Sequence, residues 1–113
     1  MEIVKLIVRV FENKENCEMF SAILEKKWPQ LLGENDKARF RAIVNKDQPN
    51  VLLVLWEFKD TETHLHIKEV IKKNIEVYLS HLKHKRIDYT GKTLIDFNNL
   101  NNAKIHSLRK TSR

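Results

Sequence analysis

The side chains best suited to chemistry in this sequence are its histidines, its single cysteine and a few cations set among apolar residues. His64 is a candidate for proton transfer, because the unperturbed pKa of histidine, about 6.5, lies near neutrality. His64 and His66 are two residues apart near an expected helix start, so they point in different directions and cannot share a metal ion. His81 and His84 could contact one ion, but a closed zinc site needs more ligands than these two. The sequence therefore predicts no metal site.

Two cations and two aromatic residues are further candidates for a binding site. Lys5 and Arg9 fall on one side of an apolar segment, where a cation needs a partner, a ligand anion or access to the sheet rim. Trp56 and Phe58 share a parity on another apolar segment, so they project together, either as core or as a pocket wall. Cys17 lies in a helical apolar stripe and is expected to be an inert buried thiol. The sequence contains no glycine-rich phosphate loop, catalytic carboxylate pair or nucleophile elbow, so nucleotide-binding, kinase and hydrolase functions lack support.

Segments of regular periodicity must position these residues, in the order strand, helix, strand, strand, helix, strand. They are expected at residues 3–11, 13–28, 39–44, 51–58, 61–82 and 87–97. Pro29 is expected to end or kink the first helix, and the basic run at 83–86 suits the C-terminus of the second. The last strand is expected to bend near Gly91. This order is typical of an α+β, ferredoxin-like βαββαβ fold, with a four-stranded antiparallel sheet and two helices on one face.

The first and third strands are apolar on both faces. One face of the first strand is wholly apolar and consists of Val4, Leu6, Val8 and Val10. We expect its other face to be free of helices, with Ile3, Ile7 and Phe11 beside side chains of the third strand. Soluble monomers seldom expose an apolar patch on the order of several hundred Å². The sequence therefore predicts a homodimer that packs sheet to sheet, since a second copy would cover this patch.

Length and charge limit the class of protein further. The 113 residues suffice for one domain with a modest core. Residues 98–113 hold four of the 21 Lys and Arg and none of the 15 acids, so we expect a domain over 1–97 and a basic, Asn-rich C-terminal extension over 98–113. The near-neutral domain and its aliphatic third strand argue against nucleic-acid binding. The lone cysteine, the lack of a signal-peptide pattern and the lack of a run of about 20 apolar residues predict a cytoplasmic protein without membrane contact.

The exit of the third strand carries a resemblance to a known family. It reads Val54-Leu55-Trp56-Glu57-Phe58-Lys59-Asp60 and leads into Thr61-Glu62-Thr63-His64-Leu65. An acidic–aromatic stretch followed by a His-Leu pair at this place resembles the antibiotic biosynthesis monooxygenase-like domains of the dimeric α/β-barrel superfamily. Glu57-Phe58 and His64-Leu65 are the equivalent residues, and the resemblance covers residues 1–97. It implies a homodimer whose two sheets form a barrel, with a pocket between sheet and helices in each subunit.

The resemblance further implies a cofactor-independent monooxygenase that acts on a small aromatic or quinol-type molecule. In such enzymes the substrate anion itself reduces O2, so the protein must deprotonate, orient and desolvate it, and neither a cofactor nor a metal is expected. His64 would be the catalytic residue, and Trp56, Phe58, Arg9 and Tyr89 would contact the substrate.

Two other functions remain open. A non-catalytic dimeric binding or assembly module on the same scaffold is the alternative, because many members of the family have no established activity. Haem degradation fits less well, since Ile7 stands where that branch carries an Asn. Lys73, Asn74 and Ile75 stand where it carries its haem-ligating histidine.

Overall fold

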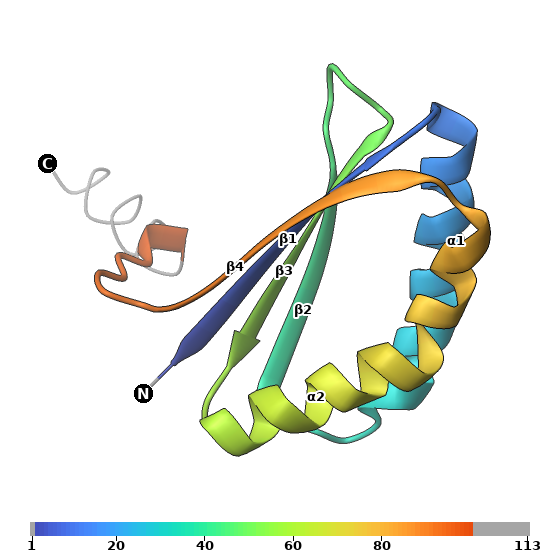
Figure 1. Ribbon diagram of the computed structural model, residues 1–113. Helices are drawn as coiled ribbons and strands as arrows, with labels where there is room; N and C mark the ends of the chain where they lie inside the picture. The colour runs from blue at the N-terminus through green and yellow to red at the C-terminus, as the bar shows by residue number, and fades with distance from the viewer. Residues whose placement is uncertain (1, 101–113) are drawn as a thin grey trace, which may run out of the picture.

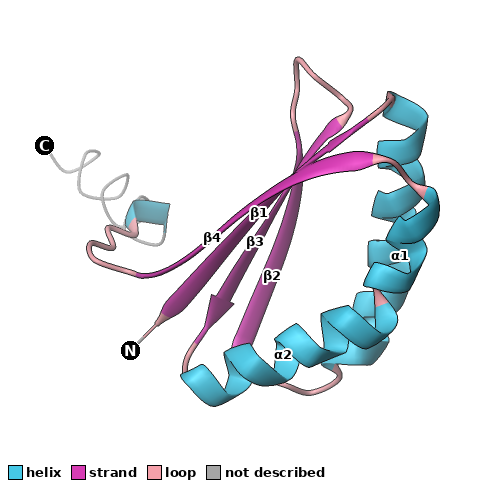
Figure 2. Cartoon of the chain, viewed as in Figure 1, coloured by secondary structure: helices cyan, strands magenta, loops and turns pink. Residues whose placement is uncertain are grey.

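The fold consists of a four-stranded antiparallel sheet with both helices on one face, as Figures 1 and 2 show. The structure is a computed structural model and describes residues 2–100. Its elements are β1 (Ile3–Phe11), α1 (Lys14–Leu32), β2 (Ala38–Val44), β3 (Val51–Phe58), α2 (Thr61–Asn74), the short 3-10 helix η1 (Glu76–His81) and β4 (His84–Lys92). The sheet order is β2-β3-β1-β4, which confirms the predicted ferredoxin-like βαββαβ fold.

The helix α1 begins as predicted but runs past its proline. The Asn13 side chain accepts a hydrogen bond from the backbone N–H of Asn16 at 2.8 Å, as an N-cap does. Pro29 lies inside the helix, which ends only at Leu32, so an end at Pro29, one of the two outcomes expected for this residue, is wrong. Pro29 has no N–H to donate to the preceding turn, and Leu31 and Leu32 of the last turn pack against the core. Gly33 then closes the helix at a φ of 55°, where glycine is favoured.

The segment between α2 and β4 differs from the prediction of one long helix to residue 82. The helix α2 ends at Asn74, η1 follows, and the basic run at 83–86 lies mostly in β4. The unpaired edge of β1 accounts for the difference, because β4 pairs with it along its full length, from Ile3 opposite Lys92 to Phe11 opposite His84. A full ladder of backbone hydrogen bonds outweighs the helical preference of a few residues. The strand consequently ends at Lys92 and does not continue to residue 97.

The two faces of β1 are reversed relative to the prediction. Ile3, Ile7 and Phe11 are buried beneath the helices, so the expectation that they lie on the helix-free face is wrong. The buried cations Lys5 and Arg9 share this covered face. Large side chains suit this layer because α1 packs aromatic residues into it; the Phe11 and Phe20 rings, for example, lie 5.5 Å apart.

The open face of the sheet is apolar and has no helix over it. Its residues on the central strands are half-buried, and they are Val4, Leu6, Val8, Val10, Val51, Leu53 and Leu55. On the edge strands Ile43, Ile87 and Tyr89 extend this face and are exposed. Glu57 binds Arg39 and Arg41 at its margin. The open face therefore has the character from which a homodimer was predicted, although it is built from different residues of β1.

The chain beyond β4 forms no further strand up to residue 100. Leu94, Ile95, Phe97 and Leu100 are strongly exposed there. Most of the predicted basic extension, 101–113, lies outside the described residues. Among the described residues, no helix has the length and apolar character needed to cross a membrane.

Candidate functional site

Aromatic rings fill the layer between the sheet and the helices. Trp56 of β3 is almost wholly buried, and its ring stacks on Phe58 at a centroid distance of 5.5 Å and an angle of 10°. Trp28 of α1 meets Trp56 edge-on at 4.7 Å, and Phe40 of β2 lies 4.8 Å from it. The shared parity of Trp56 and Phe58 thus places both rings on the helix-covered side, within a continuous aromatic cluster.

His64 lies at one end of this aromatic cluster. Asp60 caps α2 by accepting a hydrogen bond from Thr63 at 2.7 Å, and this fixes the first turn that carries His64. The imidazole packs against Phe58 at 5.1 Å, and its Nε2 is buried without a hydrogen-bond partner in the described part of the chain. Burial lowers the pKa of His64, and the charges of Lys5 and Lys68 lower it further. At neutral pH the ring is uncharged and has one nitrogen free for a ligand.

Arg9 lies at the opposite end, on the central strand β1, and is only 2% exposed. Its Nη1 donates to Nε2 of His84 at 2.9 Å, and its guanidinium lies 5.3 Å from the centroid of Phe20. Nδ1 of His84 lies 2.8 Å from the carbonyl of Leu82, so Nδ1 carries the proton and Nε2 accepts. Burial lowers the pKa of Arg9 to about 10, with a further contribution from Arg86. Arg9 therefore stays protonated at neutral pH.

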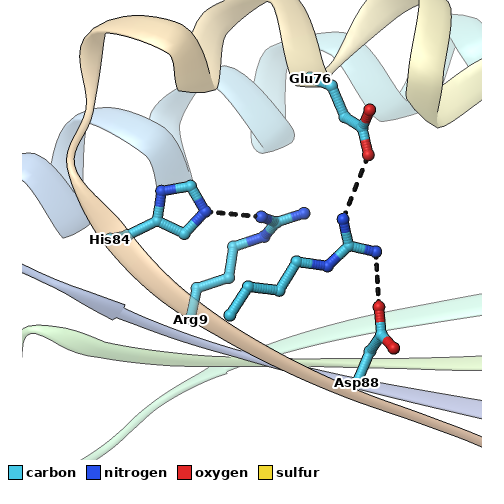
Figure 3. A network of polar contacts seen from close by, with 5 residues as sticks. Arg9, Glu76, His84 and Asp88 are labelled. Atoms are coloured by element: carbon cyan, nitrogen blue, oxygen red, sulfur yellow. Dashed lines mark hydrogen bonds and ion pairs between the residues drawn. The ribbon is translucent and has the colours of Figure 1, made fainter.

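The carboxylates nearest to Arg9 are engaged by Arg86, its cross-strand neighbour on β4. Arg86 contacts Glu76 at 3.2 Å and Asp88 at 2.6 Å. Figure 3 shows His84 beside Arg9, with Glu76 reaching from the helical segment and Asp88 from β4. Within residues 2–100, no carboxylate lies at ion-pair distance from Arg9 itself. A buried cation without an acidic partner is costly, and an anionic ligand would remove that cost.

A small cavity joins Arg9 to the aromatic cluster. Its walls include Ile7, Arg9, Phe20, Trp28, Phe40 and Trp56. Its volume is about 20 Å³, which is enough for about one water molecule. An aromatic ligand could enter only if these side chains moved. A wider hollow of about 520 Å³ at the ends of β2 and β3 meets the aromatic cluster only through Phe58.

The structure brings four of the five predicted site residues into one layer. Phe58 contacts Trp56 on one side and His64 on the other, and Arg9 lines the small cavity together with Trp56. Tyr89 lies apart from them, because it pairs with Leu6 on the open face and is 66% exposed.

Sequence reasoning missed His84, the partner of Arg9. The basic run at 83–86 was expected to end a helix, which hid the role of this histidine. A β4 register starting at residue 84 would have revealed it, because that register sets His84 opposite Phe11 on the covered face. The two rings stack at 5.2 Å.

Comparisons with known proteins show the fold. No protein-family model matches the chain, and no curated protein matches it. A dimeric ferredoxin-like protein from an uncultured marine organism is 17% identical, with a TM-score of 0.66 over 87% of this chain and 99% of that one. A Nitrosomonas europaea structure titled "Putative antibiotic biosynthesis monooxygenase" is 15% identical, with a TM-score of 0.70 over 82% and 99%. A structure from Deinococcus radiodurans with the same description is 17% identical, with a TM-score of 0.59 over 87% and 99%. The chain thus has the ferredoxin-like fold of the structures named for antibiotic biosynthesis monooxygenases.

Proposed function

We propose that this protein binds a small phenolic or quinol-type molecule as its anion between the sheet and the helices, and oxidises it with O2 without a cofactor. The observation that carries the proposal is Arg9, a buried cation with no carboxylate partner at the end of an aromatic-walled cavity. A phenolate oxygen is an anion attached to a ring, so it matches both features of this site. Several solved structures of this fold are named as putative antibiotic biosynthesis monooxygenases, which supports the same function.

The chemistry balances without any other reductant. A quinol that takes up O2 gives a hydroxyquinone and water, so one oxygen atom enters a ring C–H bond and the other leaves as water. All four electrons come from the substrate. In the proposal, Arg9 stabilises the phenolate, and the aromatic walls exclude water from it. We propose His64, whose Nε2 is buried without a hydrogen-bond partner within residues 2–100, as the base that accepts a substrate proton.

We also infer that the protein is a homodimer in which the open face of one copy covers that of the other. This face is apolar across β1 and β3 and is continued by Ile43 and Ile87 on the edge strands. Burying it would contribute about 25 cal/mol per Å² of apolar surface. Two solved structures of this fold are described as dimeric, which supports the inference. The domain over 1–97 and the cytoplasmic location stay predictions from the sequence.

One observation favours a second candidate, a non-catalytic binding or assembly module. The cavity beside Arg9 has only about 20 Å³ of space because Trp28, Phe40 and Trp56 fill the layer. A cavity that binds benzene has about 150 Å³. If these three aromatic side chains do not move aside for a ligand, the layer is only a hydrophobic core and the open face is the functional surface.

Oxygen consumption distinguishes the two candidates. We would measure O2 uptake with hydroquinone and related phenols, subtracting the rate without protein because quinols oxidise spontaneously. The proposal predicts turnover that falls at least tenfold in His64→Ala and in Arg9→Met. His66→Ala is the matched control, because His66 is exposed two residues from His64. Lack of turnover with every substrate, or equal rates in His64→Ala and His66→Ala, would contradict the proposal and favour the module.

A further inference from the structure

A charged cleft lies beside the aromatic layer, between α2 and the β1–β4 side of the sheet. Its volume is about 260 Å³, and Lys5, Lys68, Lys72 and Arg86 line it together with Glu69, Glu76 and Ile71. Four cations face two carboxylates in this space. The cleft is more than ten times the volume of the cavity beside Arg9, so it has the room that the cavity lacks.

Within residues 2–100, no ion pair joins Glu69 or Glu76 to a lysine of the cleft. Glu76 is bound by Arg86, which also holds Asp88. Within the described chain, Lys5 has no carboxylate at ion-pair distance, although it is only 7% exposed. Its pKa is lowered, chiefly by burial. Lys68 and Lys72 are one helical turn apart on α2 and repel each other, so together with Lys5 they form a three-lysine cluster that favours an anion.

The cleft and the aromatic cavity share a wall. Ile71 of α2 lines both of them, and it is the single residue common to the two linings. A ligand whose charged group sat on the three-lysine cluster would therefore have its apolar part against Ile71. Movement of this aliphatic side chain would connect the two spaces, and a ring could then reach Trp56 and Arg9 as the aromatic walls of the cavity also moved.

We propose that the ligand of this protein is an aromatic carboxylate, with its carboxylate on the three-lysine cluster and its ring in the aromatic layer past Ile71. This inference rests on the proposed function for the position of the ring, and it adds the substrate class. A free anion is the weaker reading, because it would leave the apolar wall of the cleft unused. Lys5 is the central contact, since it is the buried member of the cluster.

Binding of three matched compounds tests the substrate class. Gentisate is hydroquinone carrying one carboxylate, and methyl gentisate is its neutral ester. We would titrate each into the full chain by calorimetry, and follow the fluorescence of Trp28 and Trp56, which line the cavity. We expect gentisate to bind at least tenfold more tightly than methyl gentisate or hydroquinone, and to quench the fluorescence. The preference is expected to shrink as salt rises, because the contact is between charges.

Substitutions of single lysines test which side chains contact the carboxylate of gentisate. Lys5→Met and Lys68→Met should each weaken gentisate at least fivefold and leave hydroquinone unchanged, whereas Lys73→Met, an exposed lysine of α2 outside the cleft, should change neither. Ile71→Ala should strengthen gentisate by joining cleft and cavity. If the Lys5→Met variant does not fold, Lys5→Gln replaces it in the same binding experiment.

Each outcome decides the inference. Equal affinity for gentisate and its ester, or equal loss in Lys5→Met and Lys73→Met, would overturn it. Inorganic phosphate that displaces gentisate without changing the tryptophan fluorescence would indicate an anion site only and would also overturn it. Tight gentisate binding without O2 uptake would refute the monooxygenase but leave the inference standing. Turnover of hydroquinone without any preference for gentisate would support the monooxygenase and overturn the inference about the carboxylate.

Discussion

Arg9 offers the sharpest test of whether the buried charge serves a ligand or the fold. The perturbation is Arg9→Met, which keeps most of the volume and removes the charge. Burial lowers the pKa of Arg9 to about 10, which corresponds to about 3 kcal/mol against the charged form. Loss of the hydrogen bond leaves Nε2 of His84 unpaired at a cost of about 1–2 kcal/mol. Loss of the contact with Phe20 costs up to about 1 kcal/mol more. The net expectation is a variant more stable by about 1 kcal/mol, or about 4 °C in Tm.

Thermal unfolding of the ligand-free protein, followed by circular dichroism, measures this change. The double variant Arg9→Met, His84→Phe should be more stable still by about 1 kcal/mol, because it removes the unpaired nitrogen and keeps a ring stacked on Phe11. Lys14→Met, at an exposed cation of α1, is the control and should change Tm little. A fall of about 4 °C or more in Arg9→Met would refute the reasoning, because it would show that Arg9 contributes to folding as a structural group.

Three further predictions concern pH, chemistry and assembly. Because the pKa of His64 is lowered in the folded protein, the unfolded chain binds a proton on this imidazole at a higher pH than the folded protein does. The contribution of neutral His64 to the free energy of unfolding is therefore complete above about pH 6.5 and is lost as pH falls below that value. His64→Gln should flatten the fall of Tm between about pH 7.5 and about 5.5, and His66→Gln should not; parallel curves in both would count against this. Burial raises the pKa of Cys17, so a thiol reagent should react only after denaturation, and fast labelling of the native protein would disprove this. Leu55→Glu should convert the dimer to monomers in sedimentation and Met19→Glu should not, whereas a wild-type monomer at micromolar concentration would refute the dimer.

The order of the elements could be predicted because each has a distinct period, but the faces of β1 could not. A period of two separates Val4 from Lys5, yet both sets of residues contain apolar side chains, so the pattern does not say which set meets the helices. Only packing decides this. Ile3 and Phe11 are large enough to fill the layer beneath α1 and α2, whereas the valines suit a flatter surface.

The candidate site was predictable where it depends on parity along one strand. Trp56 and Phe58 were expected to project together, and they stack. Contacts between distant segments were not predictable, because they depend on the register of β4 against β1. That register turns Tyr89 to the open face and carries His84 to Arg9, 75 residues away in the chain.

The strand β1 serves two surfaces through alternate residues, and this constrains how the sequence can vary. Even-numbered positions from Val4 to Val10 face the open side, and odd-numbered positions from Ile3 to Phe11 face the layer covered by the helices. Substitutions in one set can accumulate without touching the other, so the open face and the helix-covered layer can diverge independently. Insertion or deletion of one residue has the opposite effect, because it exchanges the two sets and turns Lys5 and Arg9 toward the apolar open face. Within β1, therefore, length is expected to vary far less than identity.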